Sequence, residues 1–151
     1  MKMPNLYLFI MSFFYVGYFK YAPGTMASMI TAFFYFFIPS LYLIQISIIT
    51  VIMISGFYLC YIYNTQIKKD DPSFIVIDEV LGMSIALFML PKSFIVYLLS
   101  FIIFRALDIF KPFFISHIEK IDYGVGIMLD DLISGLLTLF FINFMLLYSL
   151  I

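Results

Sequence analysis

The stretch from Leu41 to Tyr63 contains no charged side chain. It is longer than the roughly 20 apolar residues that a helix needs to cross a bilayer. Further apolar blocks lie at residues 5–19, 26–38, 80–90, 93–104 and 132–151. Hydrophobic residues make up 65% of the chain and charged residues 11%, against about half and about a quarter in soluble domains. The sequence therefore predicts an integral membrane protein.

The apolar blocks predict an all-α, polytopic helical bundle that forms a single domain over residues 1–151. We expect about four to five spans, plus an N-terminal helix that is embedded or interfacial. That first block lacks the small-residue cleavage site of a signal peptide, so we expect it to be retained. Pro39-Ser40 and Pro91-Lys92 predict tight turns between neighbouring helices. The blocks at 80–90 and 93–104 are short, and form either spans extended into adjacent polar segments or a re-entrant hairpin.

Charged residues gather on one predicted side of the membrane. If each block from residue 26 onward crosses once, segments 20–25, 64–79 and 105–131 share one side, and only Lys2 and Lys92 fall elsewhere. Most of the Lys and Arg residues lie on this side, so the positive-inside rule makes it cytoplasmic. The net charge of −1 gives no basic excess, and we expect no nucleic-acid partner.

Seven of these charges directly abut apolar blocks, where ionisable groups are costly and point to function. They are Asp78, Glu79, Arg105, Asp108, Lys111, Asp130 and Asp131. Five carboxylates gathered together would repel one another, and two cations are too few to neutralise them. Mg²⁺, which takes oxygen ligands and phosphate, is the simplest remedy. Zinc would want histidine or cysteine, and the chain has one of each, His117 and Cys60.

The segment Phe104–Pro112 combines both signs of charge. On a continuous helix Arg105 and Asp108 share a face, with Lys111 one turn further along and Pro112 near the helix end. This arrangement offers a metal-binding carboxylate beside two cations that suit a phosphate. An Arg105–Asp108 ion pair that caps a span explains the segment equally well when it is taken alone.

Two glycine-containing segments precede predicted helices. Gly124 and Gly126 come shortly before Asp130, where backbone N–H groups near a helix N-terminus could approach a phosphate. In "YAPGTMAS", residues 21–28, the Pro-Gly pair predicts a turn, with Thr25 and Ser28 as candidate helix N-caps.

If the ligand is a phosphate ester, the chain lacks the residues that metal-independent phosphatases and those of the haloacid type use for catalysis. Cys60 has no arginine-bearing loop after it, and its apolar surroundings predict a buried small hydrophobe. A histidine nucleophile would need a second histidine, and the haloacid type would need a strand followed by Asp-x-Asp. Metal-assisted hydrolysis remains, in which an ion activates water and neutralises phosphoryl oxygens.

Four motifs, "YAPGTMAS", "IDEVLGM", "FRALDIFKP" and "GVGIMLDDLISG", occur in an order and with spacings that resemble phosphatidylglycerophosphatase A. The resemblance covers about residues 17–135 and implies a small multi-pass enzyme of the bacterial inner membrane, with its active site facing the cytoplasm. It implies Mg²⁺-dependent removal of the terminal phosphate from phosphatidylglycerophosphate, giving phosphatidylglycerol. Ala27, Lys20 and Ser134 depart from the usual residues of this family.

The resemblance also implies which residues act. All seven charged residues would form the catalytic site, and the five carboxylates would be the metal ligands. Arg105 and Lys111 would bind substrate, supported by Thr25, Gly82, Gly124 and Gly126. The residues leave open the number of metal ions, the nucleophile (water or an aspartate), the oligomeric state and the acyl-chain preference.

Two other functions fit parts of the pattern. A small transporter would use the acidic cluster as a cation path, but it would predict charges in the middle of the spans, and the apolar blocks at 26–63, 80–104 and 132–151 hold none apart from Lys92 in a turn. A phospholipid-headgroup phosphotransferase would carry aspartates on successive turns of adjacent helices, which "LDDLISG" matches only in part.

Overall fold

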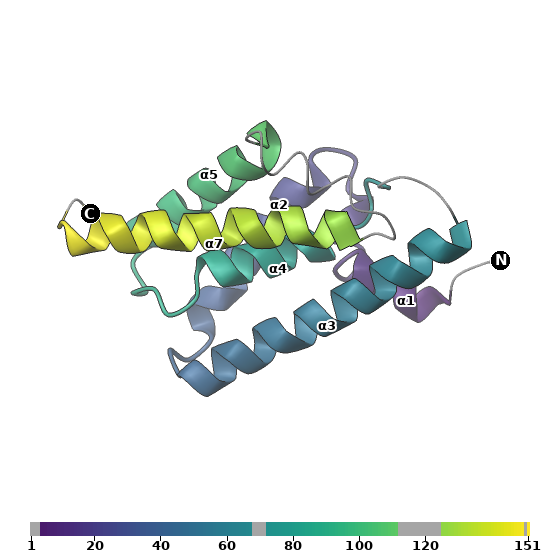
Figure 1. Ribbon diagram of the computed structural model, residues 1–151, viewed down its shortest axis with the longest axis horizontal. Helices are drawn as coiled ribbons and strands as arrows, with labels where there is room; N and C mark the ends of the chain where they lie inside the picture. Colours follow the sequence, from purple (N-terminus) through teal and green to yellow (C-terminus); the bar gives the residue numbers. More distant parts are fainter. Residues whose placement is uncertain (1–3, 68–71, 112–124, 150) are drawn as a thin grey trace.

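The computed structural model describes residues 4–67, 72–111, 125–149 and 151, and these residues form helices with no β-strand. In chain order the helices are α1 (Asn5–Met11), a 3₁₀ turn η1 (Val16–Tyr18), α2 (Pro23–Phe37), α3 (Tyr42–Ile67), α4 (Ile77–Ala86), α5 (Phe94–Phe110) and α7 (Val125–Leu147). The short helix α4 lies behind α7, with α3 and α5 on opposite sides (Figure 1). The all-α class predicted from the sequence is confirmed.

Helix α4 is the centre of the bundle. Nine of its ten residues are buried, and it contacts α2, α3, α5 and α7. Two glycines set its distance from α7. A Cβ on Gly82 would come within 2.6 Å of the Asp131 carbonyl oxygen, and a Cβ on Gly135 would collide with the Gly82 carbonyl. The backbones of α4 and α7 therefore approach one another more closely than side chains at these two positions would allow.

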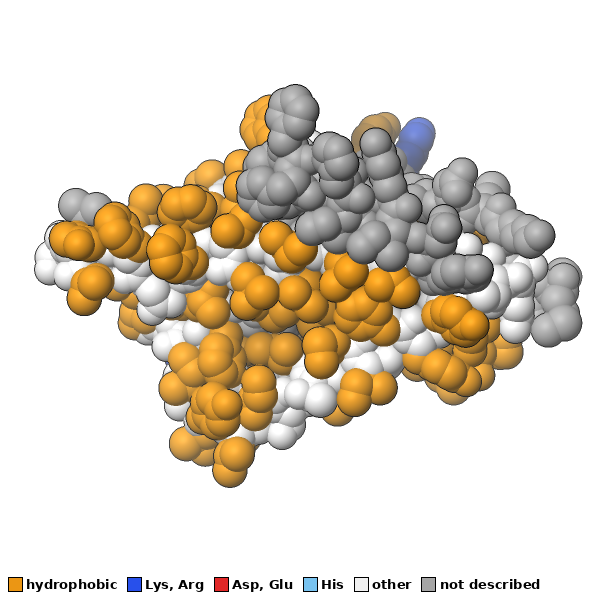
Figure 2. Space-filling model, viewed as in Figure 1, with side chains coloured by type: hydrophobic (Ala, Val, Ile, Leu, Met, Phe, Trp, Pro, Cys, Tyr) orange, Lys and Arg blue, Asp and Glu red, His pale blue; other side chains and the backbone are white. Residues whose placement is uncertain are grey.

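Two helices, α3 and α7, are long and apolar enough to cross a membrane, over Tyr42–Gln66 and Val125–Leu147. Large hydrophobic side chains cover their outer surfaces. Leu43, Val51 and Ile54 on α3 are each more than half exposed, and so is Phe140 on α7. Figure 2 shows such side chains spread over both helices in this view. Cys60 is buried within α3, as predicted.

The predicted turns at Pro39-Ser40 and Pro91-Lys92 join α2 to α3 and α4 to α5, as expected. Helix α5 continues past residue 104 and ends at Phe110, so the expected extension is confirmed there. Helix α4 likewise begins before its block, at Ile77, but it ends at Ala86, short of residue 90. Helix α4 has 10 residues, or about 15 Å at 1.5 Å per residue, half of what a bilayer requires.

The start of α2 also differs from the prediction. The helix begins at Pro23, so the Pro-Gly pair lies in its first turn and forms no separate turn. Its N-cap residue is Ala22, in a left-handed conformation, and Thr25 and Ser28 lie inside the helix. The Ser28 hydroxyl donates to the Gly24 carbonyl rather than capping the helix. Proline at the first helical position explains this start, because its φ is already helical and its missing N–H is not needed there.

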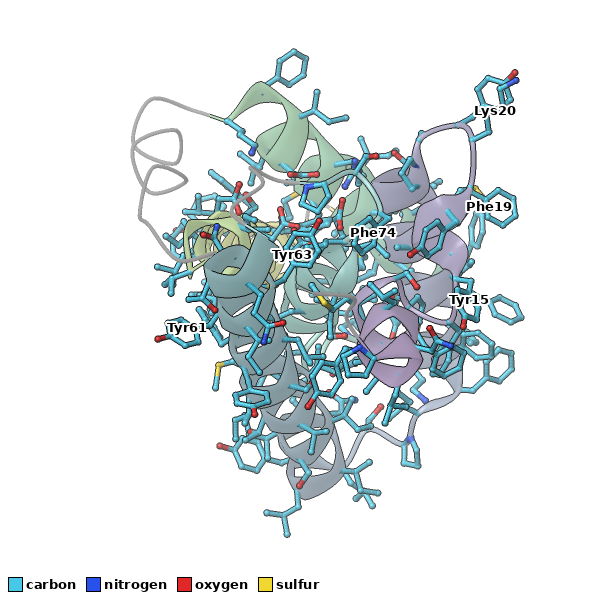
Figure 3. All side chains as sticks on the ribbon, turned by 90° about the vertical axis from the view of Figure 1, so that its right-hand side faces the viewer. Tyr15, Phe19, Lys20, Tyr61, Tyr63 and Phe74 are labelled. Atoms are coloured by element: carbon cyan, nitrogen blue, oxygen red, sulfur yellow. The ribbon has the colours of Figure 1, made fainter. Side chains whose placement is uncertain are left out.

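The N-terminal segment packs against the residues that precede α4. The Val76 N–H donates to the Met11 carbonyl at 3.0 Å, and a Cβ on Gly17 would collide with the Phe74 carbonyl. The Phe74 ring lies between Tyr18 and Tyr63, with centroids 5.3 and 5.6 Å away. Tyr63 and Phe74 lie near each other in the middle of the molecule in Figure 3. The segment therefore holds the chain that leads into α4.

Candidate active site

A polar cavity of about 350 Å³ lies where four segments meet. The start of α2, the residues leading into α4, the end of α5 and the start of α7 supply its lining. All seven charged residues predicted for the site line this cavity: Asp78, Glu79, Arg105, Asp108, Lys111, Asp130 and Asp131. Residues separated by more than 50 positions are thus brought to one place, as the charge pattern predicted.

Each helix places its charges by a simple local rule. Asp78 and Glu79 lie in the first turn of α4, where the partial positive charge of the helix N-terminus stabilises carboxylates. Arg105 and Asp108 lie on one face of α5, three residues apart. Lys111 follows as the C-cap with a φ of 39°, the left-handed conformation in which many helices end.

Three carboxylates form a compact group. Asp78, Glu79 and Asp131 each offer an oxygen, and these oxygens lie within 4.8 Å of one another. Asp78 and Asp131 are only 7% and 3% exposed. One oxygen of each residue, Asp78 Oδ1, Glu79 Oε2 and Asp131 Oδ1, is buried without a hydrogen-bond partner among the described residues. Buried, unpaired carboxylate oxygens are costly, so this group, hereafter the acidic trio, is a candidate binding site for a cation.

Electrostatics support the same reading for the two members in α4. Burial, and then the charge of Glu79, raises the pKa of Asp78 well above its usual range. Burial also raises the pKa of Glu79. The charge of Glu79 opposes ionisation of Asp78, and the charge of Asp108 opposes ionisation of Glu79. A bound cation would relieve that repulsion.

The two cations pair with the remaining two carboxylates. Arg105 Nη1 lies 2.5 Å from Asp108 Oδ2 and 3.9 Å from Glu79 Oε1. Lys111 Nζ lies 2.8 Å from Asp130 Oδ2, and the other oxygen of Asp130 accepts from the Asp131 N–H at 2.9 Å. The Arg105–Asp108 ion pair considered in the sequence analysis therefore forms. Both of its residues line the polar cavity, so it does more than cap the end of an apolar helix.

Only some of the residues predicted to support substrate binding lie at the cavity. Thr25 lines the cavity from the first turns of α2, and Gly82 supports Asp131 through the close contact of α4 with α7. Gly126 was predicted in a loop but is buried in the first turn of α7, outside the cavity lining. Gly124 lies outside the described residues.

Gly24 is a cavity-lining residue whose role the sequence analysis did not predict. It lines the cavity, and a Cβ at this position would collide with the Glu79 carboxylate. The only signal was the glycine directly after Pro23, which was interpreted as part of a turn. The first turn of α2 thus faces Glu79 and leaves room for its carboxylate.

Known proteins resemble this chain over most of its length. The family profile of phosphatidylglycerophosphatase A matches residues 9–146. The chain belongs to the phosphatidylglycerophosphatase A family. The resemblance predicted from the four motifs is confirmed, and the family does not favour the transporter or phosphotransferase alternatives.

Curated relatives cover most of the chain. Phosphatidylglycerophosphatase A of Escherichia coli is 32% identical over 141 residues, 91% of this chain and 82% of that protein. Phosphatidylglycerophosphatase A of Haemophilus influenzae is 34% identical over 119 residues, 76% of this chain and 73% of that protein. A Bacteroides thetaiotaomicron protein, named as a candidate phosphatidylinositol-3-phosphatase, is 32% identical over 130 residues, 79% of this chain and 80% of that protein. No solved structure matches the chain.

Proposed function

We propose that this protein hydrolyses the terminal phosphomonoester of phosphatidylglycerophosphate, giving phosphatidylglycerol and inorganic phosphate. Membership of the phosphatidylglycerophosphatase A family supports this activity. The observation that carries it is the polar cavity, in which the acidic trio lies beside Arg105 and Lys111. Such a site suits an anionic phosphate and a hard cation together.

The acidic trio fits Mg²⁺. Its donors are all carboxylate oxygens, and three of them are buried without protein partners among the described residues. We propose Asp78, Glu79 and Asp131 as the residues that hold the ion. Asp108 and Asp130, predicted as further ligands, are engaged by Arg105 and Lys111 and would instead position these cations. When bound, Mg²⁺ would neutralise phosphoryl oxygens and lower the pKa of a coordinated water.

The cations bind the phosphate in this proposal. Arg105 is held by Asp108 and still has Nε without a hydrogen-bond partner among the described residues, so its planar fork can reach a phosphate oxygen. Lys111, held by Asp130, supplies a second positive charge. The first turn of α2, with Thr25, adds backbone N–H groups at a helix N-terminus, which favour anions.

Two routes to phosphorus remain. A carboxylate either accepts a proton from an attacking water or attacks phosphorus itself. A single turnover in ¹⁸O-labelled water, combined with a rapid quench that traps any phosphoenzyme, distinguishes them. Label trapped in an enzyme carboxylate excludes direct attack by water, whereas label only in the released phosphate, with no phosphoenzyme after a rapid quench, supports it.

We propose a multi-pass protein of the bacterial inner membrane, with the polar cavity facing the cytoplasm. Helix α3 ends and α7 begins on the same side of the molecule (Figure 1), and the start of α7 lines the polar cavity. Lys20 and Lys92 are both exposed and would lie on opposite sides. In a Cys60→Ser background, an impermeant maleimide applied to intact cells should label Lys92→Cys and spare Lys20→Cys. The reverse pattern would contradict this orientation.

Phosphate release from phosphatidylglycerophosphate by the purified protein, with Mg²⁺ and with EDTA, tests the activity. We expect release only with Mg²⁺. Phosphatidylinositol 3-phosphate belongs in the same assay because of the name of the Bacteroides relative. A folded protein that releases no phosphate from phosphatidylglycerophosphate would refute the proposal, and preference for the inositol lipid would reassign the substrate.

A further inference from the structure

A second cavity, of about 530 Å³, shares helices α2 and α4 with the polar one. Helices α2, α3 and α4 supply most of its wall, through residues that include Ile30, Thr31, Ile48, Ile52, Val80 and Ser84. Its volume falls within the range of about 300–1,000 Å³ that is typical of ligand pockets. Neither the family nor the proposed reaction assigns it a role.

The chemistry of this cavity is apolar throughout. Its two small hydroxyl groups are turned into their own helices: Thr31 donates to the Ala27 carbonyl at 2.8 Å and Ser84 to the Val80 carbonyl at 2.7 Å. The Tyr35 hydroxyl donates to Gln45 Oε1. The wall therefore offers no free proton donor from these groups. A cavity of this kind excludes water and favours a hydrocarbon.

The two cavities are built on the same pair of helices. On α4, Glu79 lines the polar cavity and the next residue, Val80, lines the apolar one. On α2, Thr25 lines the polar cavity and Thr31 the apolar one, about 9 Å further along the helix. A ligand with a charged end and a hydrocarbon end would match this sequence of polar and apolar walls.

The apolar cavity also communicates with the lipid-facing surface. Phe34, which is 59% exposed, and Phe14, which is 63% exposed, both line it. A chain could therefore enter sideways from the bilayer, without crossing the polar cavity.

We propose that the apolar cavity binds one acyl chain of the phospholipid whose headgroup occupies the polar cavity. This inference rests on the proposed function and adds a subsite to it. Leaving the bilayer brings the chain little hydrophobic gain, because lipid tails are as apolar as the wall. The benefit is positional: a fixed chain limits the orientations from which the headgroup can approach the acidic trio.

The test fills the cavity and compares two substrates. Ile48→Trp adds a large ring at the wall, whereas Ile54→Trp adds the same ring on the exposed side of α3, where Ile54 is 63% exposed. The substrates are dipalmitoyl phosphatidylglycerophosphate in mixed micelles and its deacylated headgroup. For Ile48→Trp we expect kcat/KM to fall about tenfold on the diacyl substrate, equivalent to about 1.4 kcal/mol, with the deacylated headgroup unaffected. Ile54→Trp should change neither.

Each outcome decides a separate point. An Ile48→Trp protein that loses activity equally on both substrates, or on neither, would overturn the subsite. A wild-type protein that hydrolyses no phosphatidylglycerophosphate would refute the proposed function instead.

A second measurement needs no variant and covers the case in which Ile48→Trp does not fold. Phosphatidylglycerophosphate with a diazirine in one acyl chain is photolysed with the wild-type protein. Labelling of α2 and α4 at Thr31 or Ser84, suppressed by excess unlabelled substrate but not by phosphatidylcholine, would support the subsite. Labelling confined to outward positions such as Ile54, or equal suppression by phosphatidylcholine, would overturn it.

Discussion

Gly82→Ala should disable the enzyme by moving two helices apart while leaving it folded. The added Cβ would lie 2.6 Å from the Asp131 carbonyl oxygen, whereas ordinary contacts begin at 3.4 Å. Helices α4 and α7 would therefore have to separate by about 0.8 Å at this point. Asp78 and Glu79 lie on α4 and Asp131 on α7, so the same separation opens the acidic trio.

The expected magnitudes follow from this displacement. A misplacement near 1 Å in a catalytic group costs about 100-fold in rate, so kcat on phosphatidylglycerophosphate should fall by about that factor. Overpacking costs about 1–3 kcal/mol, and the better helix propensity of alanine offsets about 1 kcal/mol of it. The net loss of about 0–2 kcal/mol leaves a folded protein.

A matched control comes from Gly56, another buried helical glycine. Its Cβ would meet the Sδ and Cε atoms of Met128, the flexible end of a side chain that adapts easily. Gly56→Ala should therefore keep activity within about threefold of wild type. Both variants are compared by phosphate release and by thermal unfolding in detergent. Full activity in Gly82→Ala, or equal loss in Gly56→Ala, would refute the reasoning.

Three further variants probe the remaining parts of the site. Asp131→Asn should reduce turnover by at least about 1,000-fold, because it removes a charge from the acidic trio. Unchanged membrane insertion is the control, and a fully active variant would exclude Asp131 from the site. Arg105→Lys should lower kcat/KM by about 10–100-fold, since lysine cannot replace a bidentate fork. Lys92→Arg, before the start of α5 and outside the cavity lining, should be silent, and equal effects of the two substitutions would contradict a phosphate-binding role. Gly24→Ala should raise the Mg²⁺ concentration for half-maximal activity about tenfold by displacing Glu79, which a Mg²⁺ titration measures; an unchanged midpoint would argue against Glu79 as a ligand.

The sequence predicted the parts of the fold that depend on runs of one residue type. Long apolar stretches indicated α3 and α7, and prolines marked the turns before α3 and α5. The sequence also predicted that the charged segments come together. In a bundle of antiparallel helices, every second connecting segment lies on the same side. Neither prediction requires knowledge of side-chain packing.

Pairing within the site could not be predicted in the same way. The Arg105–Asp108 pair follows from spacing within α5, but only the packing of the end of α5 against α7 assigns Lys111 to Asp130. The role of Gly24 was hidden for the same reason, since its contact with Glu79 joins α2 to α4. The extent of α4 was misjudged because an apolar block marks burial as readily as it marks a span.

The position of α4 at the centre of the bundle has a consequence for how the protein is made. Helix α4 brings Asp78 and Glu79 into place before α7, with Asp131, has been synthesised. Helix α5 follows directly after α4 and carries Arg105, whose guanidinium lies 3.9 Å from Glu79. The growing chain thus receives a counter-charge for its buried acids before the last acid arrives. A chain that ended between α4 and α5 would therefore leave Asp78 and Glu79 without the counter-charge of Arg105.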